Sequence, residues 1–483
     1  MWKEDLIMNA RQTPRAENSD LFLDCLPLLL LLVGILAFSG CAGFVRKEYQ
    51  PPAVTLPDQW QIQPETGEQV LAAHQWWQVF KDPELDRLIT LALETNNDLA
   101  AATIKVRKAR LQAGLTATNL TPDLSISANA GTQKDLDSGN TSDSSGTNTS
   151  LSWELDLWGK LAASRDAAEW EAQATAQDRA ATALSLVGTT AGVYWQIASL
   201  NQAIATSREG IAYTLKTLEL VRIKYQAGEV SRLDLLQAEQ NVESQKADLA
   251  DLLQQMAQAR SALAVLFDQA PERSMADPKQ VSEMPMPVLD AGIPAAVLGN
   301  RPDLKAAEMR LRGTLADADA TRASYYPKLS LTAALGTSST ELLRFLQNPV
   351  ATLGAGLVLP FVQWNQARLN TRIADAEFEQ AVVEFRQKLY EALKEVEDAL
   401  SARQNYMVQE VALRRSCILA KEAEKIAEIR YKSGKTGVQA WLDQQETRRT
   451  ADLALAKNRY NQLKNMMVLY QALGGDGSID SIP

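Results

Sequence analysis

Four short segments of the chain alternate apolar and polar residues with a period of two. They lie at residues 124–134, 148–157, 328–336 and 351–361. This alternation predicts β-strands with one apolar and one polar face. Strands of about 9 to 11 residues with this pattern are typical of transmembrane β-barrels, although the edge of a soluble β-sandwich has the same pattern. The polar stretch 134–148, between the first two segments, predicts a solvated loop.

Longer segments have a helical period instead. Apolar residues recur at steps of three and four in residues 235–266 and again in residues 453–470. These heptad patterns predict long helices that pack side by side as in coiled coils, although an ordinary helical bundle has similar spacing. Residues 161–224 contain no proline. At 1.5 Å per residue this stretch could form a helix of roughly 95 Å.

The sequence contains two copies of one unit. Residues 97–100 (NDLA) recur as 302–305 (PDLK), a shift of 205, and residues 225–228 (YQAG) recur as 431–434 (YKSG), a shift of 206. An offset that holds over so long a stretch indicates an internal duplication of about 200 residues. Each copy is predicted to contain a helix, two strands, a long helix, a tight turn and a second long helix.

The N-terminal region has the features of an export signal. Residues 26–38 are uncharged, which is too short for a membrane-spanning helix of about 20 residues but suits the apolar part of a secretory signal. Ser39 and Gly40 precede Cys41, and this arrangement resembles a bacterial lipobox, in which the cysteine receives a diacylglycerol lipid and is further acylated with palmitate. Ala42 after the cysteine resembles an outer-membrane sorting signal. The alternative is a buried free cysteine.

These patterns together divide the chain into six parts. We expect a lipoprotein signal peptide at 1–40, an extended linker at 41–75, a first repeat at 76–270, a linker at 271–294, a second repeat at 295–475 and a C-terminal tail at 476–483.

Composition narrows the classes of function. The net charge of −10 argues against a general nucleic-acid binder, because such proteins usually carry a basic face. A single histidine, His74, and three cysteines offer little for a His/Cys metal site or a disulfide framework. The sequence has no Walker-type glycine loop, GxSxG or HExxH motif. We therefore expect no enzyme, no cofactor and no metal centre.

Four strands cannot close a membrane barrel, since the smallest have about 8 strands and an open edge is not tolerated in lipid. Oligomerisation is therefore required if the strands span a membrane. Two copies would give 8 strands with a lumen filled by side chains, whereas three copies would give 12 strands and room for passage. The expected fold is mainly α with a transmembrane β-barrel, continued by a helical tube.

Four motifs carry a specific family resemblance. They are WWQVF at 76–80, SWELDLWG at 152–159, NRPDL at 300–304 and YPKLSLT at 326–332. The chain resembles the TolC-like outer-membrane factors, in particular the lipoprotein (NodT/OprM-like) branch that serves resistance-nodulation-division efflux pumps. The resemblance implies a homotrimer with a 12-stranded β-barrel and a periplasmic α-helical barrel, anchored by lipid in the outer membrane and without chemistry of its own.

The same resemblance suggests three functions. The favoured one is the outer-membrane channel of a tripartite pump, which gives passive exit to drugs or other toxic small molecules. Its partners would be a periplasmic adaptor (membrane fusion) protein and an inner-membrane resistance-nodulation-division pump. The second is a tunnel for ATP-driven protein secretion. The third is a trimer that bridges the envelope layers without transport.

The turns at 225–228 and 431–434 join long helices, and in the resembled family such tips line a periplasmic aperture. The resemblance implies adaptor contacts at Tyr225, Gly228, Lys432 and Gly434. It implies a gate formed by Asp443, Tyr431 and Asp234.

The family's gate pattern is incomplete in this chain. Ala440 stands where an aspartate commonly precedes Asp443 by three residues, and Thr436 stands where a basic residue commonly follows the tyrosine. Three copies of Asp443 converging on an axis would attract cations. The alternative is a solvated helix face, on which an aspartate near a helix start is a favourable dipole partner.

Overall fold

The computed structural model describes residues 45–62, 76–271, 299–341 and 346–475, together with Pro278, Pro287 and Pro294. The predicted signal peptide, Cys41 and most of the linker 271–294 lie outside the described residues. The chain divides into two compact units. Unit 1 contains residues 1–49, 114–167 and 314–377, and unit 2 contains residues 50–113, 168–313 and 378–483.

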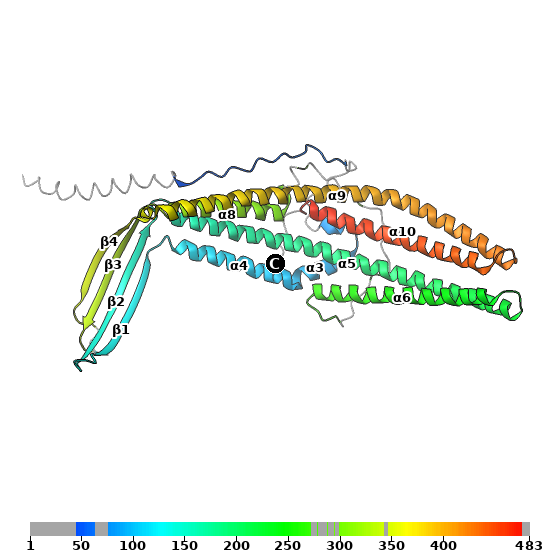
Figure 1. The fold of residues 1–483 in the computed structure, drawn as a ribbon, viewed down its shortest axis with the longest axis horizontal. Helices are drawn as coiled ribbons and strands as arrows, with labels where there is room; N and C mark the ends of the chain where they lie inside the picture. The colour runs from blue at the N-terminus through cyan, green and yellow to red at the C-terminus, as the bar shows by residue number, and fades with distance from the viewer. Residues whose placement is uncertain are drawn as a thin grey trace, which may run out of the picture. The chain divides into compact units, whose positions relative to one another are not determined.

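Unit 1 contains a four-stranded antiparallel sheet in the order β1-β2-β3-β4 (Figure 1). The strands are β1 (Asp123–Lys134), β2 (Thr141–Leu155), β3 (Lys328–Ser339) and β4 (Val350–Val358). The central pairing of β2 with β3 joins the two repeats, with Leu151 opposite Ala333. β1 and β4 are the outer strands, so each has one edge without a partner in this sheet.

The solvated loop predicted at 134–148 is wrong over most of its length. β2 begins at Thr141, and the turn itself is confined to the residues around Gly139, which has a φ of 72°. Asp135 closes this turn, since its Oδ1 accepts hydrogen bonds from the backbone N–H groups of Asp137 and Ser138. Backbone pairing does not need apolar side chains, and β2 pairs with β1 from Thr141 onward. A hydroxyl-rich strand was therefore mistaken for a loop.

The fourth strand ends earlier than the predicted residue 361. β4 stops at Val358, and Pro360–Val362 form the short 3-10 helix η2. Proline has no backbone N–H and cannot continue a ladder of hydrogen bonds.

Among the residues that the structure describes, no helix is both long and apolar enough to cross a membrane.

Two long helices run through both units. α5 (Lys160–Gln226) has 67 residues and α9 (Trp364–Lys432) has 69, so the long uninterrupted helix predicted from residue 161 is confirmed. The other helices are η1 (Trp76–Phe80), α3 (Pro83–Thr95), α4 (Asn97–Thr118), α6 (Arg232–Leu266), α8 (Pro302–Ala323) and α10 (Val438–Ala472).

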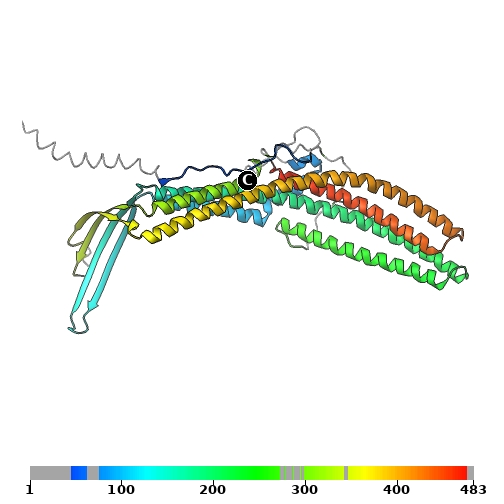
Figure 2. The same cartoon turned by 45° about the horizontal axis from the view of Figure 1, so that its top comes forward.

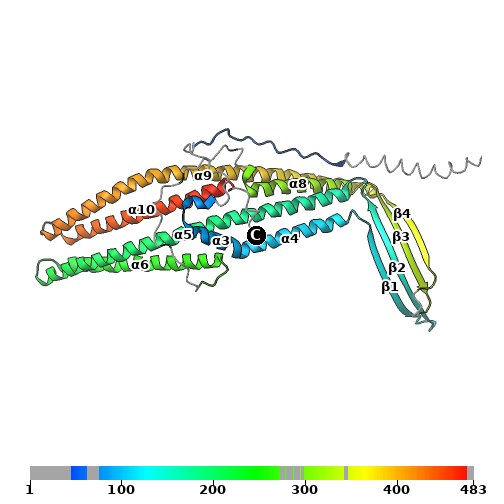
Figure 3. The ribbon, with the colours of Figure 1, turned by 180° about the vertical axis from the view of Figure 1, so that it is seen from behind.

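In unit 2 the long helices form two helical hairpins. α5 returns as α6 and α9 returns as α10, and the two hairpins lie side by side with their turns at the same end (Figures 2 and 3). The predicted heptad face of α6 is buried at Ala238, Val242, Met256 and Leu263. This burial of apolar side chains is the main stabilising contribution to the hairpins.

The core of unit 2 contains several residues of the sequence motifs. Trp76 stacks on Tyr470 with ring centroids 4.5 Å apart, and Phe80 packs against Trp195. Arg301 is 7% exposed and donates to Asp303, to Glu395 and to the last turn of α10. The motif arginine therefore fixes the start of α8 against α9 and α10.

Candidate functional site

The two hairpin turns have the same hydrogen bonds. In the first, the N–H of Gly228 donates to the carbonyl of Tyr225 at 3.0 Å, and in the second Gly434 donates to Tyr431 at the same distance. In each turn a longer bond spans five residues, as in a Schellman motif. Gly228 and Gly434 have φ values of 77° and 71°, which L side chains rarely adopt. The sequence repeat is therefore a repeat of backbone geometry, in which a glycine supplies the left-handed residue of each turn.

Asp234 belongs to a helix cap. It is the third residue of α6, and its carboxylate accepts from the backbone N–H of Ser231 at 2.9 Å and from the Ser231 hydroxyl at 2.6 Å. The Ser231 hydroxyl in turn accepts from the N–H of Asp234, which completes a capping box. Asp234 was expected to act at a gate. The described contacts of its carboxylate hold the start of α6.

Tyr431 lies inside the second hairpin. Its side chain is 2% exposed and packs on Trp441, with ring centroids 5.3 Å apart. The ammonium of Lys224 lies 5.1 Å from the Tyr431 ring. Burial, and then the negative charges of Asp234 and Glu229, raise the pKa of the Tyr431 hydroxyl. These contacts make Tyr431 part of the packing between the two tips.

Asp443 is placed differently. It is exposed on α10 and accepts a hydrogen bond from Gln439 one turn earlier, at 2.6 Å. Lys432 is also exposed and pairs with Glu428 at 2.7 Å. Tyr225 is 39% exposed, in contrast to its repeat counterpart Tyr431. The structure therefore separates the predicted residues into buried Tyr431, capping Asp234 and exposed Asp443, Lys432 and Tyr225.

The second hairpin contains an ion pair between a buried carboxylate and a partly exposed arginine that the sequence did not reveal. Glu424 of α9 is 4% exposed and accepts from the guanidinium of Arg448 at 3.0 Å. Burial raises the pKa of the Glu424 carboxyl, against the opposing effect of Arg448. The Arg448 guanidinium also lies 6.0 Å from the ring of Tyr213 on α5. A buried carboxylate paired with arginine resists separation of α9 from α10.

Trp441, the central side chain of the tip, was also missed. It lies with Val438 and Leu442 in a cluster that joins α5, α6, α9 and α10. The available signal was the heptad spacing of Val438, Trp441, Leu442 and Gln445 at the start of α10. Gln445 is buried as well and donates to the Thr217 hydroxyl of α5 at 3.0 Å.

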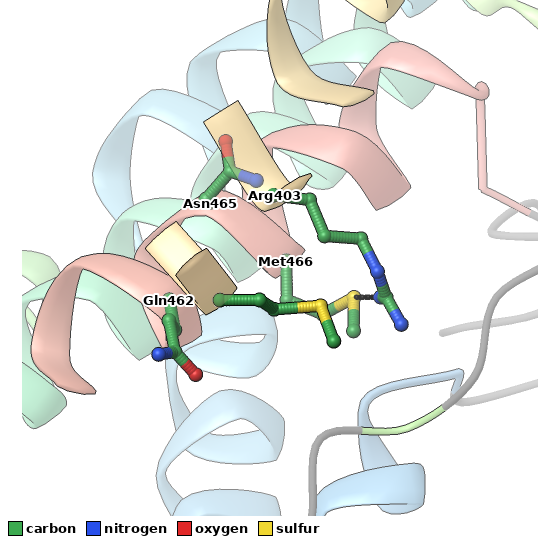
Figure 4. Close-up of a pocket in the computed structure, with 5 residues that line it drawn as sticks. Arg403, Gln462, Asn465 and Met466 are labelled. Carbon is green, nitrogen blue, oxygen red and sulfur yellow. Dashed lines mark hydrogen bonds between the residues drawn. The ribbon is translucent and has the colours of Figure 1, made fainter. Parts of the chain in front are cut away.

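Two cavities among the described residues differ in size and openness. One lies between α9 and α10, lined by Arg403, Met407, Gln462, Asn465 and Met466, and it measures about 10 Å³ (Figure 4). That volume admits about one water molecule. A larger open cleft of about 690 Å³ lies between α4 and α5 and contains Arg107, Arg110 and Arg179. No group of three metal-ligating side chains occurs within the described ranges.

The described residues closest after Cys41 begin at Val45. In unit 1, Arg46 pairs with Asp166 at 2.9 Å and Lys47 pairs with Asp375 at 3.1 Å. The backbone N–H of Lys47 also donates to buried Asp319. These contacts fix the segment that follows the predicted lipid anchor, which itself lies outside the described residues.

Comparisons with known proteins agree with this geometry. The family model described as outer membrane efflux protein matches residues 88–267 and 293–475. The pyoverdine export outer membrane protein OpmQ of Pseudomonas putida is 30% identical over 444 residues, which cover 89% of this chain and 94% of OpmQ. Toxin and drug export protein A of Aggregatibacter actinomycetemcomitans is 28% identical over 454 residues, covering 94% and 98%.

Solved structures resemble the chain as well. The open state of the MtrE outer membrane channel of Neisseria gonorrhoeae has a TM-score of 0.78 and 29% identity. The match covers 89% of this chain and 98% of MtrE.

Proposed function

The chain belongs to the outer membrane efflux protein family, and from this membership we infer that it is the outer-membrane channel of a tripartite efflux pump. The observation that carries the inference is the match of the family model to both repeats, over 88–267 and 293–475. The protein is a channel component and not an enzyme. It gives passive exit, since the energy comes from the inner-membrane pump.

The channel is a homotrimer in the outer membrane that works with a periplasmic adaptor and a resistance-nodulation-division pump. The sheet of unit 1 supports this assembly, because β1 and β4 each leave one edge unpaired and lipid tolerates no open edge. Three copies supply 12 strands, which is enough for a lumen that solutes can pass. The hairpins of unit 2 supply the helical part of the tunnel.

The substrates that we propose are small molecules. The name of OpmQ describes pyoverdine export, and that of the Aggregatibacter relative describes export of toxin and drug. Protein secretion remains the alternative function. A non-transporting bridge finds no support in either relative.

For the periplasmic aperture we propose that exposed Asp443 lines the passage and that Tyr431 keeps the tip closed by packing. Asp234 then contributes by holding the start of α6. Tyr225, Gly228, Lys432 and Gly434 at the turns are the proposed contacts of the adaptor. The exposure of Tyr225 and Lys432 supports such contacts.

Photo-crosslinking in intact cells tests the function. A photoreactive residue at Lys432 is expected to capture a periplasmic adaptor, which mass spectrometry would identify. The matched control is a probe at Lys394, an exposed lysine that lies earlier in α9, away from the turn, and is paired with Asp398; it should not capture the adaptor. Capture of an ATP-driven secretion complex would replace efflux by protein export.

Lipid attachment has a separate test. We propose that Cys41 is acylated, so Cys41→Ser should abolish labelling by radioactive palmitate. Cys417→Ser is the control, since Cys417 is buried in unit 2 and should not affect labelling. Label that persists in Cys41→Ser would show that the anchor is elsewhere.

A further inference from the structure

The internal duplication extends to the short helices that flank the long ones. α4 and α8 correspond at a shift of 205 residues, and they bury the same positions. Leu99, Val106 and Ala113 of α4 are buried, as are their counterparts Leu304, Leu311 and Ala318 of α8. α5 and α9 correspond at a shift of 206, which matches Trp158 just before α5 to Trp364 at the start of α9.

Each short helix packs on the long helix of its own repeat. In the first repeat, Arg179 of α5 donates to the Thr103 hydroxyl of α4 at 3.0 Å. In the second repeat, Glu395 of α9 accepts from Arg301 just before α8 at 2.7 Å. The two contacts occupy different positions of the repeat, since the shifts match Thr103 to Glu308 and Arg179 to Phe385, but each joins a short helix to the long helix of its own repeat.

α8 makes a further contact for which α4 has no counterpart among the described residues. It also packs on α5, the long helix of the other repeat. There Arg310 binds Glu171 at 3.2 Å and forms a second ion pair with Asp178. By the two shifts, Arg310 corresponds to Lys105 of α4, while Glu171 and Asp178 correspond to Glu377 and Glu384 of α9. The charges required for the same contact are therefore present a second time.

In the single chain, the surface of α4 around Lys105 and the surface of α9 around Glu377 and Glu384 are both exposed to solvent. Lys105, Glu377 and Glu384 are exposed, and within the described residues Lys105 has no ion-pair partner. The corresponding face of α9 is also uncovered. Ala174 of α5 is fully buried, whereas its counterpart Gln380 on α9 is exposed.

The two helices differ in exposure in the same way seven residues earlier. Ala167 of α5 is 8% exposed, and its counterpart Ile373 of α9 is 54% exposed. Leu369 and Val383 of α9 are 59% and 63% exposed, so Ile373 belongs to a larger apolar surface that a partner can cover.

We propose that α4 of one copy packs on this face of α9 in the next copy, with Lys105 placed between Glu377 and Glu384 of that next copy. This contact between two chains is equivalent to the contact that α8 makes with α5 within one chain. When this contact is repeated around the trimer, the subunits form a closed ring. Each α9 packs against the α4 of one neighbouring copy, and each α4 packs against the α9 of the other. The inference rests on the trimer of the proposed function and adds the side chains that join its subunits.

Chemical crosslinking between two introduced cysteines tests the contact. Residues that form an ion pair through long side chains often have Cα atoms too far apart for a disulfide, so the reagent is a short bis-maleimide. In a Cys417→Ser background, a chain with both Lys105→Cys and Glu384→Cys should yield covalent trimers on a denaturing gel. Each single-cysteine variant should remain a monomer on that gel.

Two further pairs of introduced cysteines serve as controls for the crosslinking. Arg310→Cys with Asp178→Cys reproduces the equivalent contact inside one chain, and it should react without forming covalent oligomers. Lys105→Cys with Glu422→Cys places the second cysteine on an exposed part of α9 that is 38 residues farther along, and it should give no crosslink.

The size of the native protein separates the two ways of failing. A native trimer in which the pair Lys105→Cys and Glu384→Cys does not react would overturn the contact and leave the channel function standing. A protein that is monomeric in the membrane would overturn both.

A charge exchange gives a second measurement. Lys105→Glu should increase the fraction of trimer that dissociates in mild detergent at least twofold, because it places three like charges together. Adding Glu377→Lys and Glu384→Lys should restore the original fraction. Equal dissociation of all three proteins would contradict the ion pair.

Discussion

The two hairpin tips have the same turn and different means of holding it. In the first tip a capping box of Ser231 and Asp234 fixes the start of α6. In the second tip Gly437 occupies the cap position without a side-chain bond, and the buried ring of Trp441 packs beneath Tyr431 instead. Duplication therefore conserved the backbone while the stabilising interactions diverged.

The divergence continues along the helices. Leu218 of α5 and Val242 of α6 are buried in the first hairpin, and their counterparts at a shift of 206 are Glu424 and Arg448. An apolar contact in one hairpin is thus an ion pair in the other. An ion pair of this kind adds little net stability relative to an apolar contact, but removing Arg448 alone would leave the Glu424 carboxylate buried and unpaired.

The largest expected effect is on Trp441. Trp441→Ala should destabilise the second tip by about 3–5 kcal/mol, because it removes a fully buried aromatic ring and leaves a cavity. Its counterpart Leu235 is only partly buried, so Leu235→Ala should cost less. Hydrogen exchange of the amides at the starts of α10 and α6 measures both. Equal loss of protection in the two variants would show that the tips are not held differently.

The next prediction concerns Asp443 and its counterpart Gln237. If exposed Asp443 lines the aperture, Asp443→Ala should raise the single-channel conductance and reduce cation selectivity. Gln237→Ala is the matched control and should leave both unchanged. Planar bilayer recordings decide the question, and an unaltered conductance in Asp443→Ala would remove this residue from the proposed gate.

A smaller effect is expected when the capping box of the first tip is introduced into the second tip. Gly437 has φ −68° and ψ 165°, which a serine at an N-cap also adopts. Gly437→Ser with Ala440→Asp should therefore stabilise the start of α10 by about 0.5 kcal/mol, because glycine is itself tolerated at an N-cap and the added carboxylate supplies much of the gain. Ser231→Ala should cost about 1 kcal/mol in the first tip. Thermal unfolding of the purified trimer compares them, and a destabilised double variant would contradict the equivalence of the two tips.

Much of the fold could be predicted from the sequence, because helix and strand periods are local. The long helix after residue 161 follows from a proline-free stretch, and the duplicated turns at Gly228 and Gly434 follow from the repeat of the YxxG sequence. The beginning of β2 could not be found in this way, since Thr141–Asn148 pair through backbone groups that no hydrophobic pattern records.

The candidate site was less accessible to sequence reasoning. Asp234 carried a usable signal, the Ser-x-x-Asp spacing of a cap, but it was assigned to a gate by resemblance. The pairing of Glu424 with Arg448 depends on the register of α9 against α10, which residues 24 apart in the chain do not specify. Only the packed structure reveals that Tyr431 points into the hairpin.

The smallest effect is expected from pH, and it distinguishes the ion pair from its apolar counterpart. Burial raises the pKa of Glu424 above its ordinary value of 4.5, although Arg448 opposes the shift and Glu428 adds to it. Because the folded state then holds the proton more tightly than the unfolded state, stability falls as pH rises from about 4.5 through the raised pKa. Glu424→Leu with Arg448→Val copies Leu218 and Val242 of the first hairpin and should remove this part of the pH dependence. Hydrogen exchange of α10 between pH 4.5 and 7 tests it, with α6 of the same protein as the internal reference. A pH dependence that is unchanged in the double variant would assign the titration to another group.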